Sequence, residues 1–295
     1  MLEAFTVDVG VEPAVLTPPG SVRAAIAWRC LRDCELRHAT AMLEAKWEYV
    51  ISRDGLPGAG SAELKWEVII HPDGSTEYFR ATPGIGTPVL PAGSYTTGQE
   101  GHEIVTMTVP WVHPTVEIRN RLTNLHSVRV DVTSEPGGVE TYRAPVTLLL
   151  PGDGYSNVTT TEPVFSGPDL GLRLEVPERS IRCGAPVRGN VALARTARSV
   201  RVALVRSHSW DHEGTLGGVV KQMRADFKVD DIRLDAEAGA AHSFRLEVPD
   251  DAPPTCIPPH HSLRWFVRAE APTGVWPFRN AAEVELELVV YNGDH

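Results

Sequence analysis

The chain has 295 residues, a formal net charge of −10 and 42% hydrophobic residues. This apolar content is enough for one large or two medium-sized hydrophobic cores. The negative charge argues against a nucleic-acid binder, which needs a basic face to release counterions from phosphates. It equally disfavours binding to an anionic membrane surface.

The first residues of the chain are acidic. Glu3 and Asp8 precede the first basic residue, Arg23, so the basic start and apolar core of a secretory signal are missing. No uninterrupted apolar run approaches membrane-spanning length. We therefore expect a cytoplasmic protein without an integral membrane segment, and we interpret the glycosylation pattern at Asn157 as a chance match.

Apolar and polar residues alternate in the first third of the chain. In residues 43–51, LEAKWEYVI, the apolar residues fall on one face and Glu44, Lys46 and Glu48 on the other, which is the period of a half-buried strand. Residues 63–81 place two such segments around the turn sequence HPDGS, and this pattern predicts a β-hairpin.

The same alternation continues to the end of the chain. It recurs at 201–205, 243–248, 262–269 and 283–291, between clusters drawn from 25 glycines and 24 prolines. Two short segments, 35–43 and 217–223, are the helix candidates, and neither sustains a long helical stripe. The sequence therefore predicts an all-β protein.

Three pairs of segments indicate an internal repeat. VRAAIAW from Val22 matches VRGNVAL from Val187, and IVTMTVP ending at Pro110 matches SFRLEVP ending at Pro249. HSVRVDV from His126 matches HSLRWFV from His261. Because the matches occur in the same order, we expect two copies of one β-sandwich in tandem.

A polar segment divides the two copies. Residues 152–169, GDGYSNVTTTEPVFSGPD, follow the last strand pattern of the first copy and have the composition of a linker. We therefore predict domains at 1–165 and 166–295.

A proline-rich segment follows the strand pattern at 243–248. Consecutive strands of a sandwich often belong to different sheets, and the joining segment cannot keep a ladder of hydrogen bonds. Its prolines donate no N–H and stiffen such a crossing; they are Pro249, Pro253, Pro254, Pro258 and Pro259. In the strand that follows, we expect Trp265 and Val267 on the core side and Arg264 and Phe266 on the other.

The second half resembles an arrestin-type C-terminal domain. The motifs that carry the resemblance are GAPVRGNVAL, the V-P and P-P-T steps of VPDDAPPT, and the strand HSLRWFVRAEAP with its central aromatic residue. The first half resembles the arrestin N-terminal domain through VRAAIAW and the Pro-Thr step of TVPWVHPTV, although Ala24 replaces the usual glycine. Within that clan the chain is most similar to the bacterial sporulation-control and retromer-subunit types.

The resemblance implies two arrestin-like, immunoglobulin-like sandwiches and a non-enzymatic adaptor or scaffold that binds a protein partner. No counterpart of the charged, phosphate-sensing core of visual arrestins is found, so receptor binding is not implied. Open sandwich edges offer a physical route to binding, because an exposed edge strand can pair with a partner's strand.

The cluster HSWDHEG supplies the residue types of a metal site. His208, Asp211 and His212 are candidate ligands, and His260 or His261 could add another. The spacing of His208 and His212 suits a metal pair on a helix, whereas this stretch follows a strand pattern, so we favour a solvated hairpin loop. A metal-binding module or metal-dependent enzyme stays open as the alternative.

Four arginines form a basic stripe in an otherwise acidic protein. A solvated strand face explains them most simply, and the alternative is a docking surface for an acidic or phosphorylated partner, because the planar guanidinium matches carboxylate and phosphate geometry. They are Arg195, Arg198, Arg201 and Arg206.

Cysteine and acidic pairs carry no recognisable chemistry. Cys30 and Cys34, spaced C-x3-C, read as ordinary thiols, and with Cys183 and Cys256 they are too few for a disulfide framework or a four-thiolate zinc site. The preference of aspartate for turns is enough to explain the pair Asp250 and Asp251. We expect no catalytic residue and no cofactor, and a homo-oligomer or a structural self-assembly component stays open.

Overall fold

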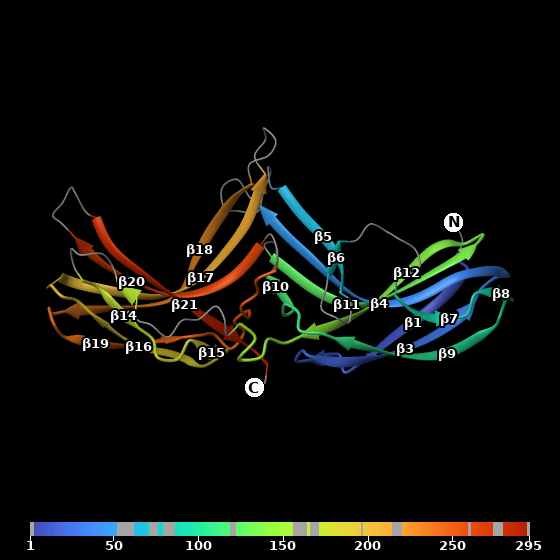
Figure 1. Ribbon diagram of the computed structural model, residues 1–295, viewed down its shortest axis with the longest axis horizontal. Coiled ribbons are helices and arrows are strands. Elements are labelled where there is room, and N and C mark those ends of the chain that lie inside the picture. Colours follow the sequence, from blue (N-terminus) through green and yellow to red (C-terminus); the bar gives the residue numbers. More distant parts are fainter. Residues whose placement is uncertain are drawn as a thin grey trace. The chain divides into compact units, whose positions relative to one another are not determined.

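The structure is a computed structural model that describes residues 3–51, 62–70, 76–78, 86–118, 122–155, 164–165, 171–195, 197–213, 220–258, 261–273 and 280–293. Every regular element in these ranges is a β-strand, so the predicted all-β class is confirmed. The chain forms two compact units, residues 1–149 and 150–295 (Figure 1). The predicted linker, 152–169, lies at the start of unit 2, and residues 152–155 and 164–165 of it are described.

Unit 1 contains two sheets. Its strands are β1 (Phe5–Glu12), β2 (Val15–Leu16), β3 (Gly20–Cys30), β4 (Cys34–Ile51), β5 (Ala62–Ile70), β6 (Thr76–Tyr78), β7 (Thr87–Leu90), β8 (Gly93–Tyr95), β9 (Glu100–Val109), β10 (Val116–Ile118), β11 (Leu122–Glu135) and β12 (Gly138–Leu148). The small sheet has the order β1, β3, β9, and the larger sheet is built on β2, β12, β11, β4, β5, β6. The predicted hairpin is confirmed as the antiparallel pair β5 and β6, while its turn lies outside the described residues.

Unit 2 repeats this plan. Its strands are β13 (Val164–Phe165), β14 (Arg173–Glu175), β15 (Ser180–Arg182), β16 (Pro186–Ala192), β17 (Ala197–Glu213), β18 (Val220–Ala236), β19 (Ala241–Glu247), β20 (His261–Thr273) and β21 (Asn280–Tyr291). The small sheet has the order β13, β14, β16, β19, and the larger sheet has the order β15, β21, β20, β17, β18. In both units a short strand, β2 or β15, pairs in parallel with the last strand.

Each unit is a sandwich whose two sheets share one core. In unit 1, Val22 and Ile26 of the small sheet join Leu43, Val128 and other side chains of the larger sheet in a single buried cluster. In unit 2, buried side chains again come from both sheets, with Val187 and Leu246 from the small one and Leu204, Val267 and Leu286 from the larger one. Alternating apolar residues on each strand produce these two inward faces.

The small sheets of the two units match residue by residue. Val22 of β3 lies opposite Met107 of β9, and Val187 of β16 lies opposite Leu246 of β19. The residue numbers of equivalent positions differ by 165 between β3 and β16 and by 139 between β9 and β19. These are the shifts of the first two sequence matches, which are thereby confirmed.

The third match is wrong by four residues. The residue after the Pro-Thr step, Val116 or Cys256, pairs with Asn124 at the start of β11 in unit 1 and with Leu263 at the start of β20 in unit 2. The residue numbers of these two partners differ by 139. His126 is therefore equivalent to Trp265, whereas the sequence match aligns it with His261. Because side chains alternate with a period of two, a shift of four preserves the apolar pattern, and the pattern alone does not reveal the error.

Both helix candidates are wrong. Residues 35–43 belong to β4, where Leu36 and His38 pair with successive residues of β11 and Arg37 is an extra, bulged residue. The bulge moves the next inward position to Ala39, so the buried residues Leu36, Ala39 and Leu43 acquire the spacing of a helix. In the second candidate, 217–223, residues from Val220 onward belong to β18, and 217–219 lie outside the described residues.

The proline-rich segment joins the two sheets of unit 2, as predicted, because β19 lies in the small sheet and β20 in the larger one. The predicted orientation of β20 is also confirmed. Trp265 is 1% exposed and its Nε1–H donates to the carbonyl of Pro253 at 3.1 Å, while Arg264 and Phe266 are half-buried on the opposite face. Pro259 lies outside the described residues.

Candidate protein-binding surfaces

The arginine stripe does not form one surface. Arg195 is exposed before β17, and the side chain of Arg198 lies outside the described residues. Arg201 donates from Nε to Asp231 Oδ2 at 2.8 Å. Arg206 lies five residues further along a regular stretch of β17 and therefore on the opposite face, with its guanidinium 5.6 Å from the centre of the Phe227 ring.

The histidine cluster lies in a strand, and the expectation of a solvated loop is wrong. Residues 208–213 form the end of β17, and the His208 side chain is 1% exposed. His208 and His212 are four residues apart, which in a strand separates their Cα atoms by about 13 Å. Asp211 occupies a position on the opposite face from His208, because strand positions alternate. The side chains of Asp211 and His212 lie outside the described residues.

The structure does bring one other histidine close to His208. His261 lies opposite Trp210 at the start of β20 and is 3% exposed, while His260 lies outside the described residues. His208 and His261 are thus diagonal neighbours on the inward face of two paired strands. Within the described ranges, no three His, Cys, Asp or Glu side chains are grouped so that they could hold a metal ion.

Cys30 and Cys34 are close but buried. Their Sγ atoms are 4.0 Å apart, and the Cys30 thiol donates to the carbonyl of Arg32 at 2.9 Å. Burial, together with the neighbouring Cys30, raises the pKa of the Cys34 thiol to about 11. The Cys34 thiol therefore stays protonated near neutral pH and is not an activated nucleophile.

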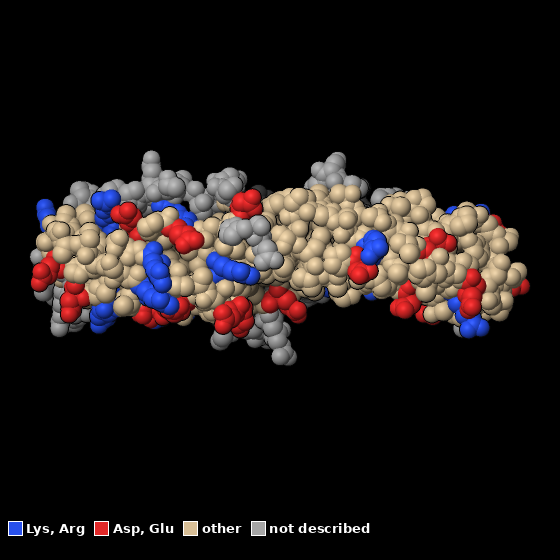
Figure 2. All heavy atoms as spheres, turned by 90° about the horizontal axis from the view of Figure 1, so that it is seen from below, with Lys and Arg blue, Asp and Glu red and all other residues tan. Residues whose placement is uncertain are grey.

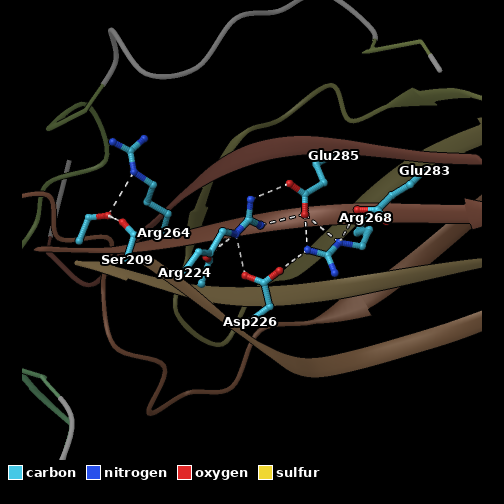
Figure 3. Close-up of polar contacts among 9 residues, drawn as sticks. Ser209, Arg224, Asp226, Arg264, Arg268, Glu283 and Glu285 are labelled. Carbon is cyan, nitrogen blue, oxygen red and sulfur yellow. Dashed lines mark hydrogen bonds and ion pairs between the residues drawn. The ribbon is translucent and has the colours of Figure 1, made fainter. Parts of the chain in front are cut away.

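An ion cluster that the sequence did not predict covers the outer face of the larger sheet in unit 2 (Figure 3). Arg224 of β18 donates through both terminal nitrogens to Glu285 of β21, at 3.0 and 2.9 Å, and through Nε to Asp226 at 2.7 Å. Arg268 of β20 bonds to the same two carboxylates and forms an ion pair with Glu283 at 3.2 Å. Side chains thereby link β18 to β20 and β21, although β17 lies between β18 and β20 in the sheet.

The cluster favours the ionised forms of Asp226, Arg224 and Arg268. Burial raises the pKa of Asp226, but hydrogen bonds from Arg268, Arg224 and Ser207 outweigh it, and the net shift is downward. Burial lowers the pKa of Arg268, but Asp226 and Glu285 more than reverse this effect. The guanidinium groups are thus committed to internal carboxylates, and the cluster stiffens the face and leaves little capacity to bind an external anion.

Unit 1 carries a more deeply buried cluster at the equivalent place. Arg129 donates to Glu44 at 2.9 Å and to Asp131 at 2.8 Å, and Arg143 donates to Glu44 at 2.8 Å. The side chains of Arg129 and Glu44 are 6% and 4% exposed. Burial raises the pKa of Glu44, but hydrogen bonds and charges from Arg143 and Arg129 outweigh it, and the net pKa is lowered.

The strand β1 is an open edge of the small sheet in unit 1, since among the described strands it pairs with β3 alone. The Phe5 carbonyl accepts from the Tyr142 hydroxyl, and the Phe5 N–H donates to a Glu140 carboxylate oxygen, so these backbone groups point away from β3. Hydrogen bonding alternates along an antiparallel pair, and the N–H and C=O groups of Val7, Val9 and Val11 therefore also point outward.

Unit 2 shows what this edge accepts. Val9 of β1 is equivalent to Leu174 of β14, because each lies opposite the equivalent residues Ile26 and Val191. There the two-residue strand β13 pairs antiparallel with β14, with Val164 opposite Leu174. The same edge of the small sheet is therefore occupied by a strand in unit 2, while in unit 1 no described strand pairs with it.

Sequence reasoning missed the ion clusters and the edge for different reasons. Arg-x-Asp at 129–131 and the alternating acidic residues of β21 are visible signals, but their partners come from strands far away in the sequence.

Among the described residues, no helix has the length and apolar character needed to cross a membrane. No family model matches the chain, and a search of curated proteins finds no match.

Proposed function

We propose that the protein is a non-enzymatic, cytoplasmic adaptor that holds an extended segment of a protein partner on the outer edge of β1. The observation that supports this function is the contrast between the two units, because the edge that is open in β1 already holds a strand in β14. Backbone hydrogen bonds to such an edge supply affinity, and the flanking side chains select the sequence. The resemblance to arrestin-type domains, in particular the bacterial sporulation-control type, supports the same role.

The side chains of β1 define the partner that would fit. Val7, Val9 and Val11 are half-buried on the core side, while Asp8 and Glu12 are exposed on the other. A strand added beside β1 alternates in the same way, so the fitting segment has apolar residues on the core side and basic or small residues opposite Asp8 and Glu12.

A pull-down with the full-length protein in native lysate tests the proposal. Val9→Pro removes an N–H that points to the edge and makes no bond to β3, whereas Val9→Ala shortens the side chain but keeps the N–H. We expect a specific partner to be retained by the parent and by Val9→Ala and lost with Val9→Pro. Asp8→Lys, an exposed change that leaves the backbone intact, should weaken capture of the same partner.

The alternatives predict other results. Capture that survives both Val9→Pro and Asp8→Lys would show that the partner does not use this edge. Elemental analysis of the purified protein distinguishes the metal hypothesis, because a stoichiometric transition metal that is lost in His208→Ala would favour a metal-binding module.

A further inference from the structure

The strand β9 is the second open edge of the small sheet in unit 1, and in the described part of the chain it pairs with β3 alone. The N–H of Cys30 donates to Gln99 at 2.7 Å, and the N–H of Gly98 donates to the Cys30 carbonyl at 2.8 Å, which fixes the direction of bonding at one end of the pair. By alternation, the odd-numbered residues of β9 bond to β3, and the even-numbered residues point their N–H and C=O groups to the open edge.

The centre of this edge carries an exposed apolar side chain. Ile104 is 63% exposed, more than any other large hydrophobic residue described. Its described neighbours across the outer face of the sheet are the small residues Ala25 and Gly10, which leave its side chain exposed. Figure 2 shows few charged side chains on the side of unit 1 where β3 and β9 lie. A long, unprotected strand with an apolar centre is a typical site of strand pairing between molecules.

Unit 2 closes the equivalent edge. Ser243 replaces Ile104 at the equivalent position of β19 and bonds to Asn190 at 2.9 Å. The N–H of Glu247, which points to the edge, donates to Asp230 of β18 at 2.7 Å. Charged pairs such as Arg245 with Glu247 occupy the outer face. The open edge is therefore specific to β9 and is not a general property of the repeated fold.

We propose that the outer edge of β9 binds a second copy of this chain, with the two β9 strands antiparallel about a two-fold axis at Ile104. In this register Ile104 lies opposite Ile104 of the second copy, and His102 lies opposite Thr106. Glu100 lies opposite Thr108, so no two carboxylates face each other across the pair. The two small sheets join into one continuous sheet of six strands, and both exposed isoleucines are buried against each other.

This proposal uses the opposite edge of the sheet from the adaptor proposal and does not depend on it. Self-association through β9 leaves the β1 edge of each copy open, and the dimer would present two such edges. Val9→Pro should therefore leave the oligomeric state unchanged.

Sedimentation velocity of the full-length protein over a range of concentrations tests the dimer. Ile104→Lys places two like charges at the two-fold axis and should weaken association by more than about tenfold, since like charges directly opposite destabilise a strand pair. Thr106→Pro removes an N–H that points to the edge, whereas the control Thr106→Val keeps it. We expect dimers in the parent and in Thr106→Val, and monomers in Ile104→Lys and Thr106→Pro at the same concentrations.

A cysteine substitution tests the register. At the two-fold axis, residue 104 lies about 5.5 Å from its counterpart between Cα atoms, which suits a disulfide. Residue 106 lies two positions from the axis and about 13 Å from its own counterpart. Under mild oxidation Ile104→Cys should form a covalent dimer and Thr106→Cys should not. A parent protein that stays monomeric at all concentrations, or dimers that persist in Ile104→Lys, would overturn the proposal.

Discussion

Thr115 and Thr255 make the same two hydrogen bonds in their respective units. The N–H of each donates to a carbonyl of the last strand, that of Leu148 or of Val290, at 2.8 Å. The Oγ1 of each accepts the N–H of that same residue at 2.9 Å. Each threonine thereby fastens the segment that crosses between sheets to the last strand of its sandwich.

Replacing either threonine by valine should destabilise its unit. Valine preserves the shape but leaves the N–H of Leu148 or Val290 without its acceptor, which costs about 1 to 3 kcal/mol when the group is buried. Thr255 and Val290 are both fully buried, so Thr255→Val should have the larger effect. Denaturant melts measure it, and the serine variants, which keep the hydroxyl, are the controls. Equal stability of the valine and serine variants would contradict this role of the hydroxyl.

The architecture could be predicted because it follows from short-range patterns. The period of two identifies strands, and the repeat around Val22 and Val187 identifies two copies. The bulge at Arg37 could not be predicted, because an extra residue in one strand depends on pairing with β11 and leaves an apolar spacing that resembles a helix. The sequence alignment of β11 with β20 is wrong for a similar reason, because a shift of four residues leaves every side chain on the same face of its strand.

The candidate surfaces were less predictable than the fold. The ion cluster around Arg268 joins three strands, and its members are far apart in the sequence. Whether an edge such as β9 is open depends on what lies beside it, and the sequence of a strand does not contain that information. The predicted arginine stripe follows one strand. Arg201 and Arg206 are an odd number of residues apart, so they lie on different faces of that strand.

Trp265 should be an anchor of unit 2. Trp265→Ala removes a side chain that is 1% exposed and leaves a cavity, so we expect a loss of roughly 3 to 5 kcal/mol. Arg264→Ala, on the outer face of the same strand, should cost far less, because the Arg264 side chain is 34% exposed. Denaturant melts of the two variants make the comparison. Similar small losses would show that the Trp265 ring does not anchor the core.

The buried ion cluster of unit 1 should be far more sensitive to truncation than an exposed ion pair. Arg129→Ala leaves Glu44 and Asp131 buried without their shared partner, and loss of one member of such a cluster costs about 3 to 5 kcal/mol. Arg23→Ala breaks only an exposed pair with Glu12 and should cost less than about 1 kcal/mol. Thermal melts followed by circular dichroism would measure both. A mild effect of Arg129→Ala would mean that water reaches the remaining carboxylates.

Mild acid should destabilise unit 1 through two histidines. Burial lowers the pKa of His113 from 6.5 to about 4, and burial together with the nearby His113 lowers the pKa of His126 from 6.5 to about 3. Between these values and 6.5 the unfolded chain binds protons that the folded chain does not, so stability is full above pH 6.5 and falls as the pH decreases. The loss approaches about 1.4 kcal/mol per pH unit for each histidine.

His126→Gln removes one of the two groups. In denaturant melts it should reduce the slope of the unfolding free energy against pH between pH 6 and pH 4.5, relative to the parent. A slope that is equal in the two proteins would show that His126 does not control the acid response.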